Sequence, residues 1–316
     1  MAALLRRSLL YVPASSPKML AKSLGLPSDN ITYDLEDSVT PARKPEARLG
    51  LKAHLSRLKS RPPAVSEIAV RINAVPTPHV IDDLAVAASS PLVDAVVVPK
   101  VESAKDLAYV SSVLHHVAPD RQAAGSRNPI SIIALIESAY AVMNLASISK
   151  ASPHLSGLIF AAEDFALDLS ITRTPSLTEF LYARSAIVTA ARAARLPSAI
   201  DLVCTSYKGE DGLSRLRDEC AGGKSMGFNG KQCIHPDQVQ TVQAMFAPSR
   251  EEVDWAVRIV VADDKATAAG RGAWTLDGKM IDAPVVGKAR AVVSKAERCG
   301  FHVPSLRLHW ADQEPE

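Results

Sequence analysis

The chain has 316 residues, of which 47% are hydrophobic, and a formal net charge of +2. This length allows one large α/β domain with an extension, and the scattered basic residues argue against nucleic acid as a partner. No uninterrupted apolar run approaches the ~20 residues that a membrane-spanning helix requires, so no membrane partner is expected.

Apolar runs rich in β-branched residues alternate with helical segments along the first 246 residues. The runs lie at 8–12, 30–35, 68–72, 95–98, 130–136, 157–160, 198–203 and 231–234. They lack strict alternation of polar and apolar residues, as expected for parallel strands covered on both faces. Helical spacing follows at 17–24, 46–58, 104–116, 177–193, 212–226 and 236–246. The pattern predicts an α/β fold, a (β/α)₈ TIM barrel, with a doubly wound open sheet as the alternative.

A C-terminal helical extension is expected beyond the barrel. Ser249 with Glu252 three residues later is typical of a capping box, which predicts a helix over 250–268. A hairpin or irregular segment is expected over 272–284 and a last helix over 285–299, and residues 302–316 are expected to be frayed. The predicted domains are therefore a catalytic barrel, 7–246, and an extension carrying a catalytic loop and tail, 247–316.

The cysteines and the amino terminus bear on the compartment. Cys204, Cys220, Cys233 and Cys299 are far apart and form no C-x-x-C pair, which is typical of free thiols in a reducing compartment. Residues 1–28 are basic and lack acids, as in a transit peptide, yet a strand starting at residue 8 leaves almost nothing to cleave. We expect a cytoplasmic protein, with the mitochondrion as the alternative.

Ionisable side chains follow seven of the eight predicted strands. They are Asp34, Glu36, Asp37, Arg71, Lys100, Glu102, Glu137, Glu163, Asp164, Asp201 and His235. A barrel places its active site at the carboxyl ends of its strands, and charges are costly to gather without a compensating ligand. We therefore expect a functional rim, in which some members pair only to hold the rim together.

Glu137 and Asp164 are the candidate metal ligands. They follow successive strands, which lie ~4.8 Å apart in a sheet, so their carboxylates can reach one ion. Two carboxylates without cysteine or paired histidines favour Mg²⁺, with Mn²⁺ as the alternative. A zinc site at Cys233 and His235 would lack its other ligands.

The sequence as a whole resembles the citrate lyase β-subunit-like group of the HpcH/HpaI aldolase superfamily. The resemblance extends over residues 7–295. It rests on RRSLLYVPASSPKML (6–20), YDLEDSV (33–39), VRIN (70–73), PKVES (99–103), ALIES (134–138), AAEDF (161–165), GKQCIHPDQV (230–239) and DGKMIDAPVV (277–286). Eight segments in the same order make the resemblance specific to this group.

The resemblance implies a Mg²⁺-dependent carbon–carbon lyase that acts on 3-hydroxyacyl-CoA thioesters and yields acetyl-CoA and an α-keto acid. Malyl-CoA, citramalyl-CoA and citryl-CoA are the candidate substrates, and the reverse, malate synthase-like reaction is also open. The implied site residues are Glu137 and Asp164 for the metal, Arg71 for the substrate oxygens, Asp282 as acid/base, and Lys18, Lys22, Ile234, His235 and Pro236 for CoA. A homotrimer or hexamer is implied as well.

Three other functions stay open. The chain is alternatively the β subunit of a citrate lyase complex that acts on a citryl-acyl-carrier-protein thioester. An aldolase that acts on free keto acids without CoA is a second alternative. A catalytically idle homologue is a third, although it would be expected to have lost one of the two carboxylates, and both Glu137 and Asp164 are present.

Overall fold

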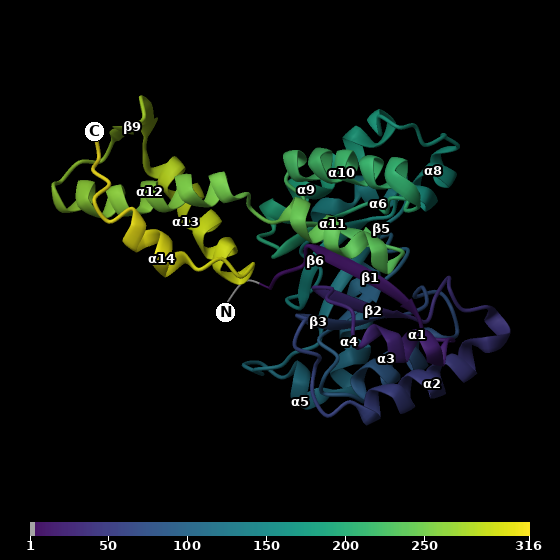
Figure 1. The fold of residues 1–316 in the computed structure, drawn as a ribbon. Helices are drawn as coiled ribbons and strands as arrows, with labels where there is room; N and C mark the ends of the chain where they lie inside the picture. Colours follow the sequence, from purple (N-terminus) through teal and green to yellow (C-terminus); the bar gives the residue numbers. More distant parts are fainter. Residues whose placement is uncertain (1–3) are drawn as a thin grey trace. The chain divides into compact units, whose positions relative to one another are not determined.

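A computed structural model describes residues 4–316, and the part up to residue 246 contains a closed barrel of eight parallel strands, which begins at Ser8 (Figure 1). The strands are β1 (Ser8–Pro13), β2 (Asn30–Asp34), β3 (Glu67–Arg71), β4 (Ala95–Val98), β5 (Ser131–Ile136), β6 (Leu155–Phe160), β7 (Ser198–Asp201) and β8 (Gly230–Cys233). Each strand pairs with the next, and β8 pairs with β1. The predicted barrel is therefore confirmed, and the open sheet is excluded.

Helices connect the strands and cover the outside of the barrel. They are α1 (Pro17–Ser23), α2 (Lys44–Arg57), α3 (Val80–Ala88), α4 (Ala104–Val117), α5 (Pro119–Gln122), α6 (Ala139–Met143), α7 (Leu145–Ile148), α8 (Ala162–Leu169), α9 (Leu181–Ala193), α10 (Gly209–Met226) and α11 (Pro236–Phe246), with short 3₁₀ turns at Pro41–Arg43 and Thr178–Phe180. Local signals explain several starts: Ser103 and Asp106, for example, form a capping box before α4. None of the helices formed by residues 4–316 combines the length and apolar character of a bilayer-spanning segment.

Closure of the barrel depends on a glycine. Gly230 lies where β8 meets the chain entering β1, and a Cβ atom there would lie 2.0 Å from the carbonyl oxygen of Arg6 and 2.5 Å from that of Arg7. Both neighbours are backbone atoms, which cannot rotate away. Only a residue without a side chain therefore allows the first and last strands to approach this closely.

Two apolar layers hold the barrel together. Side chains such as Leu9, Val97, Ile133 and Ile159 fill its interior. A larger cluster packs the outer faces of the strands against the helices. Because successive side chains of a strand point to opposite faces, strand position decides whether a residue lies inside the barrel or under the helices.

That alternation corrects the prediction for Asp201. Ile200 belongs to the barrel interior, so Asp201 points outward, where it is fully buried and forms two hydrogen bonds, of 3.1 and 2.7 Å, with Arg184 on α9. The Cβ atom of an alanine at position 223 on α10 would lie 2.5 Å from the same carboxylate, so Gly223 makes room for it. Asp201 binds helix to strand and is no member of the functional rim.

Residues Ala247–Glu316 form a second compact unit with its own core. It contains α12 (Arg250–Ala268), the hairpin strands β9 (Trp274–Leu276) and β10 (Lys279–Ile281), α13 (Ala283–Arg298) and α14 (Val303–His309). The predicted capping box is present, since the backbone N–H of Glu252 donates to Ser249 Oγ at 3.1 Å and the Glu252 carboxylate accepts from the Ser249 N–H at 2.7 Å. All three tryptophans of the chain, Trp255, Trp274 and Trp310, belong to this unit.

The prediction of a frayed tail is wrong. Residues Val303–His309 are helical, with Val303 and Leu306 buried in the core of the extension. Beyond the helix, Glu316 exchanges two backbone hydrogen bonds with Thr275 on β9, of 3.0 and 2.9 Å. Apolar burial and these backbone hydrogen bonds order the tail, although its composition alone did not indicate an ordered segment.

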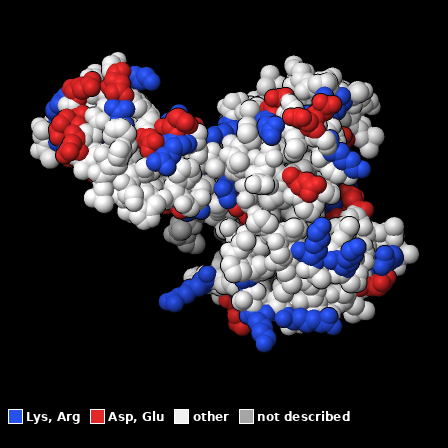
Figure 2. All heavy atoms as spheres, in the orientation of Figure 1, with Lys and Arg blue, Asp and Glu red and all other residues white. Residues whose placement is uncertain are grey.

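Charges and thiols complete the description of the surface and the interior. On the face drawn in Figure 2, basic side chains are interspersed with acidic ones. The four cysteines are all free, and Cys204, Cys220 and Cys233 are buried in the barrel unit, whereas Cys299 is partly exposed in the extension. Burial raises the pKa of Cys220 to about 12.

Candidate active site

An arginine–aspartate pair forms the floor of the rim. Asp34 ends β2 and Arg71 ends β3, and the two residues are partners in the strand register. Arg71 Nε and Nη2 donate to the two carboxylate oxygens of Asp34, each at 2.7 Å. The ring of Tyr11 on β1 lies below the guanidinium, whose central carbon is 4.6 Å from the ring centroid. Arg71 is therefore held in one orientation by two neighbouring strands.

The remaining nitrogen of Arg71 faces the loop after β2. Arg71 Nη1 is 2.9 Å from Glu36 Oε2 and 3.7 Å from Asp37 Oδ2. Asp34 also accepts the backbone N–H groups of Glu36 and Ser38, at 2.9 and 3.1 Å, which shapes this loop around the pair. Three carboxylates thus surround one guanidinium.

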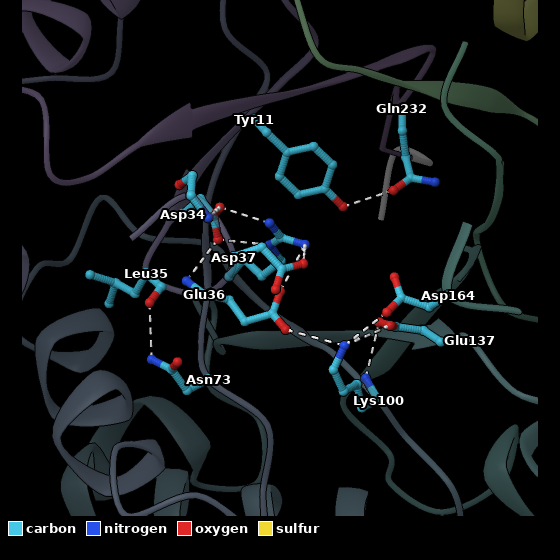
Figure 3. Close-up of polar contacts among 12 residues, drawn as sticks. Tyr11, Asp34, Leu35, Glu36, Asp37, Asn73, Lys100, Glu137, Asp164 and Gln232 are labelled. Atoms are coloured by element: carbon cyan, nitrogen blue, oxygen red, sulfur yellow. Dashed lines mark hydrogen bonds and ion pairs between the residues drawn. The ribbon is translucent and has the colours of Figure 1, made fainter. Parts of the chain in front are cut away.

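Glu137 and Asp164 meet at a single cationic atom (Figure 3). Glu137 follows β5, and Asp164 lies in the first turn of α8, after β6. Lys100 Nζ, from the loop after β4, is 3.6 Å from Glu137 Oε2 and 3.0 Å from Asp164 Oδ1. It also lies 3.7 Å from Glu36 Oε1, and its own backbone N–H donates to Glu137 Oε1 at 3.0 Å. The backbone of Lys100 has φ of 50°, which turns the residue into the site.

These carboxylates fit a hard divalent cation that keeps open positions. In the part of the chain that the structure describes, no group of three or more histidine, cysteine or acidic side chains is arranged to hold a metal ion. Mg²⁺ needs no such cage, since one or two carboxylates together with water and substrate commonly bind it. Glu137 and Asp164 converge on one positive charge, and the Lys100 side chain that provides it is long and half-exposed, so its ammonium can move toward solvent.

The pKa values reflect the crowding of charge. Burial and the neighbouring acids raise the pKa of Glu36 and of Glu137 above the ordinary carboxyl value, although Arg71 and Lys100 oppose the rise. Burial acts on Asp34 in the same direction, but the charge and hydrogen bonds of Arg71 outweigh it and hold the pKa of Asp34 below its usual value. Asp34 therefore stays ionised at lower pH than a free aspartate and is paired with Arg71, whereas Glu36 and Glu137 lie among several carboxylates, an arrangement that favours binding of a cation.

Tyr11 and Gln232 belong to the site although the sequence analysis did not single them out. Tyr11 Oη donates to Gln232 Oε1 at 2.9 Å, and the Gln232 amide donates to the carbonyl oxygens of Phe160 and Asp201 at 2.8 and 3.2 Å. Both side chains point into the barrel, Tyr11 one alternation beyond Leu9. The signal that could have found them is this period of two, once Leu9 is assigned to the interior.

A cavity of about 400 Å³ opens over these residues. Its lining includes the acidic side chains of Asp34, Glu137 and Asp164 together with the cationic Arg71. Apolar groups of Pro13, Leu135, Ala161, Val203 and Ile234 and the ring of Tyr11 line it as well. The arrangement can bind a small molecule whose anionic group pairs with Arg71 or with a bound cation.

The other predicted site residues lie around this cavity or apart from it. Ile234 lines it, and the ring of His235 stacks on Tyr207 with centroids 4.6 Å apart, while Pro236 begins α11. Tyr207 lines a second cavity, of about 940 Å³, between the loops before α9 and α10. Lys18 and Lys22 are exposed on α1 and contribute to neither cavity.

Asp282 belongs to the extension, where it caps a helix. Its Oδ1 accepts the backbone N–H of Val285 at 3.2 Å, which makes Asp282 the N-cap of α13. The predicted start of this helix at residue 285 is therefore two residues late, since α13 begins at Ala283. An aspartate in this position accepts a hydrogen bond from the first turn, at the positive end of the helix dipole.

Glu163 is engaged in an ion pair. Arg173 Nη1 donates to Glu163 Oε1 at 2.5 Å, and Arg173 Nη2 donates to Glu219 Oε1 at 2.8 Å. The arginine thereby ties the loop after α8 to α10. Together with Asp201, these contacts show that part of the predicted charged rim is structural, as the alternative interpretation expected.

Comparison with known proteins places the chain in a family. Residues 7–236 match the model of the HpcH/HpaI aldolase/citrate lyase family, so the chain belongs to it. The chain is 35% identical to citrate lyase subunit beta of Escherichia coli K12, over 94% of this chain and 95% of that protein. It is 33% identical to the mitochondrial citramalyl-CoA lyase of Homo sapiens, over 92% of this chain and 85% of that protein.

A solved structure shares the fold over nearly the same extent. The CitE protein of Mycobacterium tuberculosis, in complex with magnesium, acetoacetate and coenzyme A, is similar with a TM-score of 0.72 and 29% identity. The similarity covers 94% of this chain and 100% of that one. Family membership thus rests on sequence and structure together, and the predicted family is confirmed.

Proposed function

We propose that this chain is a Mg²⁺-dependent carbon–carbon lyase that cleaves a 3-hydroxyacyl-CoA thioester into acetyl-CoA and an α-keto acid, or forms it in reverse. The observation that carries the proposal is the convergence of Glu137 and Asp164 on one cationic position beside Arg71, at the carboxyl end of the barrel. The named activity of the human relative, a citramalyl-CoA lyase, and the magnesium and coenzyme A in the mycobacterial complex support it.

Glu137 and Asp164 would hold the ion. When bound, Mg²⁺ supplies Lewis acidity and a template for the oxygens of the keto acid; Mn²⁺ would supply the same. Arg71 stabilises the negative charge that develops on oxygen as the C–C bond breaks, and one preorganised donor of this kind is worth ~10²–10³ in rate. Because Asp34 fixes two of its nitrogens, Arg71 keeps its orientation during the reaction, and Nη1, which pairs with Glu36 at 2.9 Å, is the nitrogen that would turn to the substrate oxygen.

Proton movement needs two events. In the cleavage direction a base takes the proton of the substrate hydroxyl, the C–C bond breaks, and the enolate carbon of the departing acetyl thioester receives a proton. Asp282 is our proposed acid/base group, and general acid–base catalysis by such a group contributes ~10²–10⁴ in rate. Lys18, Lys22 and the segment Ile234–His235–Pro236 are the proposed contacts of CoA.

The proposal includes a homotrimer or hexamer. Asp282 lies in the extension and the metal position in the barrel, so an oligomer offers each barrel the extension of another copy. Mixing Glu137→Gln with Asp282→Asn protein tests this arrangement: restored activity requires sites shared between subunits. Light scattering on the purified chain gives the copy number.

The decisive assay measures acetyl-CoA release from malyl-CoA, citramalyl-CoA and citryl-CoA, with Mg²⁺ or with EDTA. Glu137→Gln removes one charge from the metal position, and Glu46→Gln, at an exposed surface pair on α2, is the matched control. We expect activity that requires Mg²⁺ and is lost only in Glu137→Gln. Full turnover by Glu137→Gln, or in EDTA, would falsify the assigned metal role.

A second candidate function is supported by the 35% identity to citrate lyase subunit beta. In this case the substrate would be a citryl thioester of an acyl-carrier protein, presented within a larger complex. The same assay with carrier-protein thioesters distinguishes the two, since a complex subunit should prefer the carrier over CoA. Co-purification of carrier and transferase subunits would favour this function.

A further inference from the structure

The hydrogen bond between Tyr11 and Gln232 has a fixed direction, and this direction bears on ligand recognition. Both side chains line the active-site cavity, and the phenol oxygen of Tyr11 lies 2.9 Å from Gln232 Oε1 (Figure 3). Building on the proposed function, we infer that Tyr11 accepts a hydrogen bond from the hydroxyl group of the 3-hydroxyacyl thioester. Tyr11 thereby distinguishes this substrate from the α-keto acid that the reaction releases.

The amide of Gln232 is held in one orientation by its neighbours. Its side chain is buried, and its nitrogen lies 2.8 Å from the carbonyl oxygen of Phe160 and 3.2 Å from that of Asp201. A carbonyl oxygen only accepts hydrogen bonds, so both positions require N–H groups. Turning the amide over would place Oε1 against these two oxygens and leave them without a donor. Gln232 Oε1 is therefore the atom that faces Tyr11.

The fixed amide determines how the phenol of Tyr11 can bind a ligand. An amide oxygen has no proton to donate, so the single hydroxyl proton of Tyr11 points to Gln232 Oε1. The rest of the phenol oxygen offers lone pairs alone. No side chain among residues 4–316 donates a hydrogen bond to this oxygen, so the acceptor is open to a ligand in the cavity.

Tyr11 acts in binding and not as the base of the reaction. Burial raises the pKa of Tyr11 above its ordinary value, and the charge of Arg71 opposes the rise without cancelling it, so the phenol stays neutral. The amide oxygen of Gln232 is no proton carrier either, so a proton accepted by the phenol has no onward path. Removal of the hydroxyl proton is left to the proposed acid/base group.

The two sides of the reaction differ at the atom that Tyr11 would contact. The hydroxyl of the thioester has a proton to donate to Tyr11 Oη. The carbonyl of the keto acid has only lone pairs, which would face those of Tyr11. To donate to this carbonyl, Tyr11 would have to leave Gln232 Oε1 unpaired, and an unpaired buried acceptor costs more than a typical hydrogen bond contributes. The pair therefore favours the alcohol over the ketone.

Two ligands that differ only in this group test the inference. Lactate and pyruvate share a carbon skeleton and a carboxylate, and their affinities for the full chain are measured by NMR titration with Mg²⁺ present. Tyr11→Phe removes the phenol oxygen but keeps the ring beside Arg71, and Tyr182→Phe, at an exposed tyrosine on α9, is the matched control. We expect Tyr11→Phe to weaken lactate about 3- to 10-fold, the range of one neutral hydrogen bond, and to leave pyruvate within about twofold. Tyr182→Phe should leave both affinities unchanged.

Removing the acceptor should reverse the preference. In Gln232→Met the hydroxyl proton of Tyr11 loses its partner and can point to a carbonyl oxygen. We expect pyruvate to gain about 3- to 10-fold over lactate in this variant, whose folding is verified by circular dichroism. On the cleaved thioester, Tyr11→Phe should raise KM and leave kcat within about twofold, because only binding before the proton transfer is lost.

The outcomes separate this inference from the proposed function. If no thioester is cleaved, the proposed function fails, whereas the lactate and pyruvate titrations still decide the role of Tyr11. Equal weakening of both ligands by Tyr11→Phe would show that the phenol only supports its neighbours, and unchanged affinities would show that no ligand donor reaches it. Either result overturns the inference, as does a lack of lactate binding by the unmodified chain. An unchanged preference in folded Gln232→Met would overturn the assigned direction of the hydrogen bond.

Discussion

Replacing Arg71 tests how strongly the arginine–aspartate pair holds the floor of the site. Arg71→Met retains the apolar stem but leaves the carboxylate of Asp34, of which 1% is exposed, without its two bonds of 2.7 Å. Breaking a buried ion pair by removing one partner costs about 3–5 kcal/mol. Two backbone N–H groups still bond to Asp34, so we expect the lower end, a loss of about 3 kcal/mol in the free energy of unfolding.

The double variant isolates the pair itself. Asp34→Asn keeps an acceptor for the backbone but removes the charge, so in Arg71→Met/Asp34→Asn position 34 no longer holds an unpaired buried anion. We expect the two losses to be non-additive by about 2 kcal/mol, measured by urea denaturation followed by far-UV circular dichroism. Losses that simply add would refute the reasoning, because they would mean that Asp34 and Arg71 stabilise the barrel independently.

The pair also predicts an acid limit. Arg71 holds the pKa of Asp34 below its ordinary value despite burial, so the unfolded chain binds the proton more readily than the folded one. The contribution of the pair is therefore fully present above pH ~4, the value for an unperturbed aspartate, and is lost as pH falls through the folded pKa. The stability difference between the unmodified chain and Arg71→Met should accordingly shrink in acid.

Three further changes have defined outcomes. Burial lowers the pKa of His54, so the folded chain resists protonation of this side chain. The contribution of His54 to stability should therefore fall as pH drops below ~6.5. His54→Gln should remove this contribution to the pH dependence of the unfolding temperature, measured from pH 5 to 8. Gly230→Ala should destabilise the barrel by about 3 kcal/mol or more, because the new Cβ atom would clash with backbone atoms. Gly222→Ala, which has open space around its Cβ atom, should stabilise α10 by about 0.5–1 kcal/mol. Equal effects of the two variants in urea denaturation would contradict the closure argument. Lys100→Met should tighten Mg²⁺ binding about fivefold in calorimetry, since a competing exposed cation is removed, and weaker binding would show that the ammonium assists the ion.

The sequence predicted the architecture well because the barrel is encoded locally. Each strand is a short buried run, and the predicted runs differ from the observed strands by only a few residues at their ends. The closing contact of β8 with β1 follows from having eight such units, and Gly230 permits it. The tail was mispredicted because Val303 and Leu306 become ordered only through burial against the extension, a tertiary effect that composition does not reveal.

The residue types of the site could be predicted from the sequence, but the pairs that these residues form could not. Glu137, Asp164 and Arg71 could be singled out because a barrel exposes its strand ends at one rim; the structure brings all three to one cavity, while their roles remain a proposal. Asp201 was misplaced because its neighbour Ile200 takes the inward position. The position of the Lys100 ammonium between two carboxylates depends on a left-handed backbone conformation that the residue type does not indicate.

The distribution of tryptophan gives the chain a natural optical probe. All three indole rings belong to the extension, and the barrel contains none, so tryptophan fluorescence, excited where tyrosine does not absorb, reports on the smaller unit alone. Far-UV ellipticity, in contrast, comes mostly from the larger one, which has most of the helices. Recording both signals on one sample therefore shows whether the two units melt together or in sequence, and whether a ligand of the barrel alters the surroundings of the extension, without attaching any label.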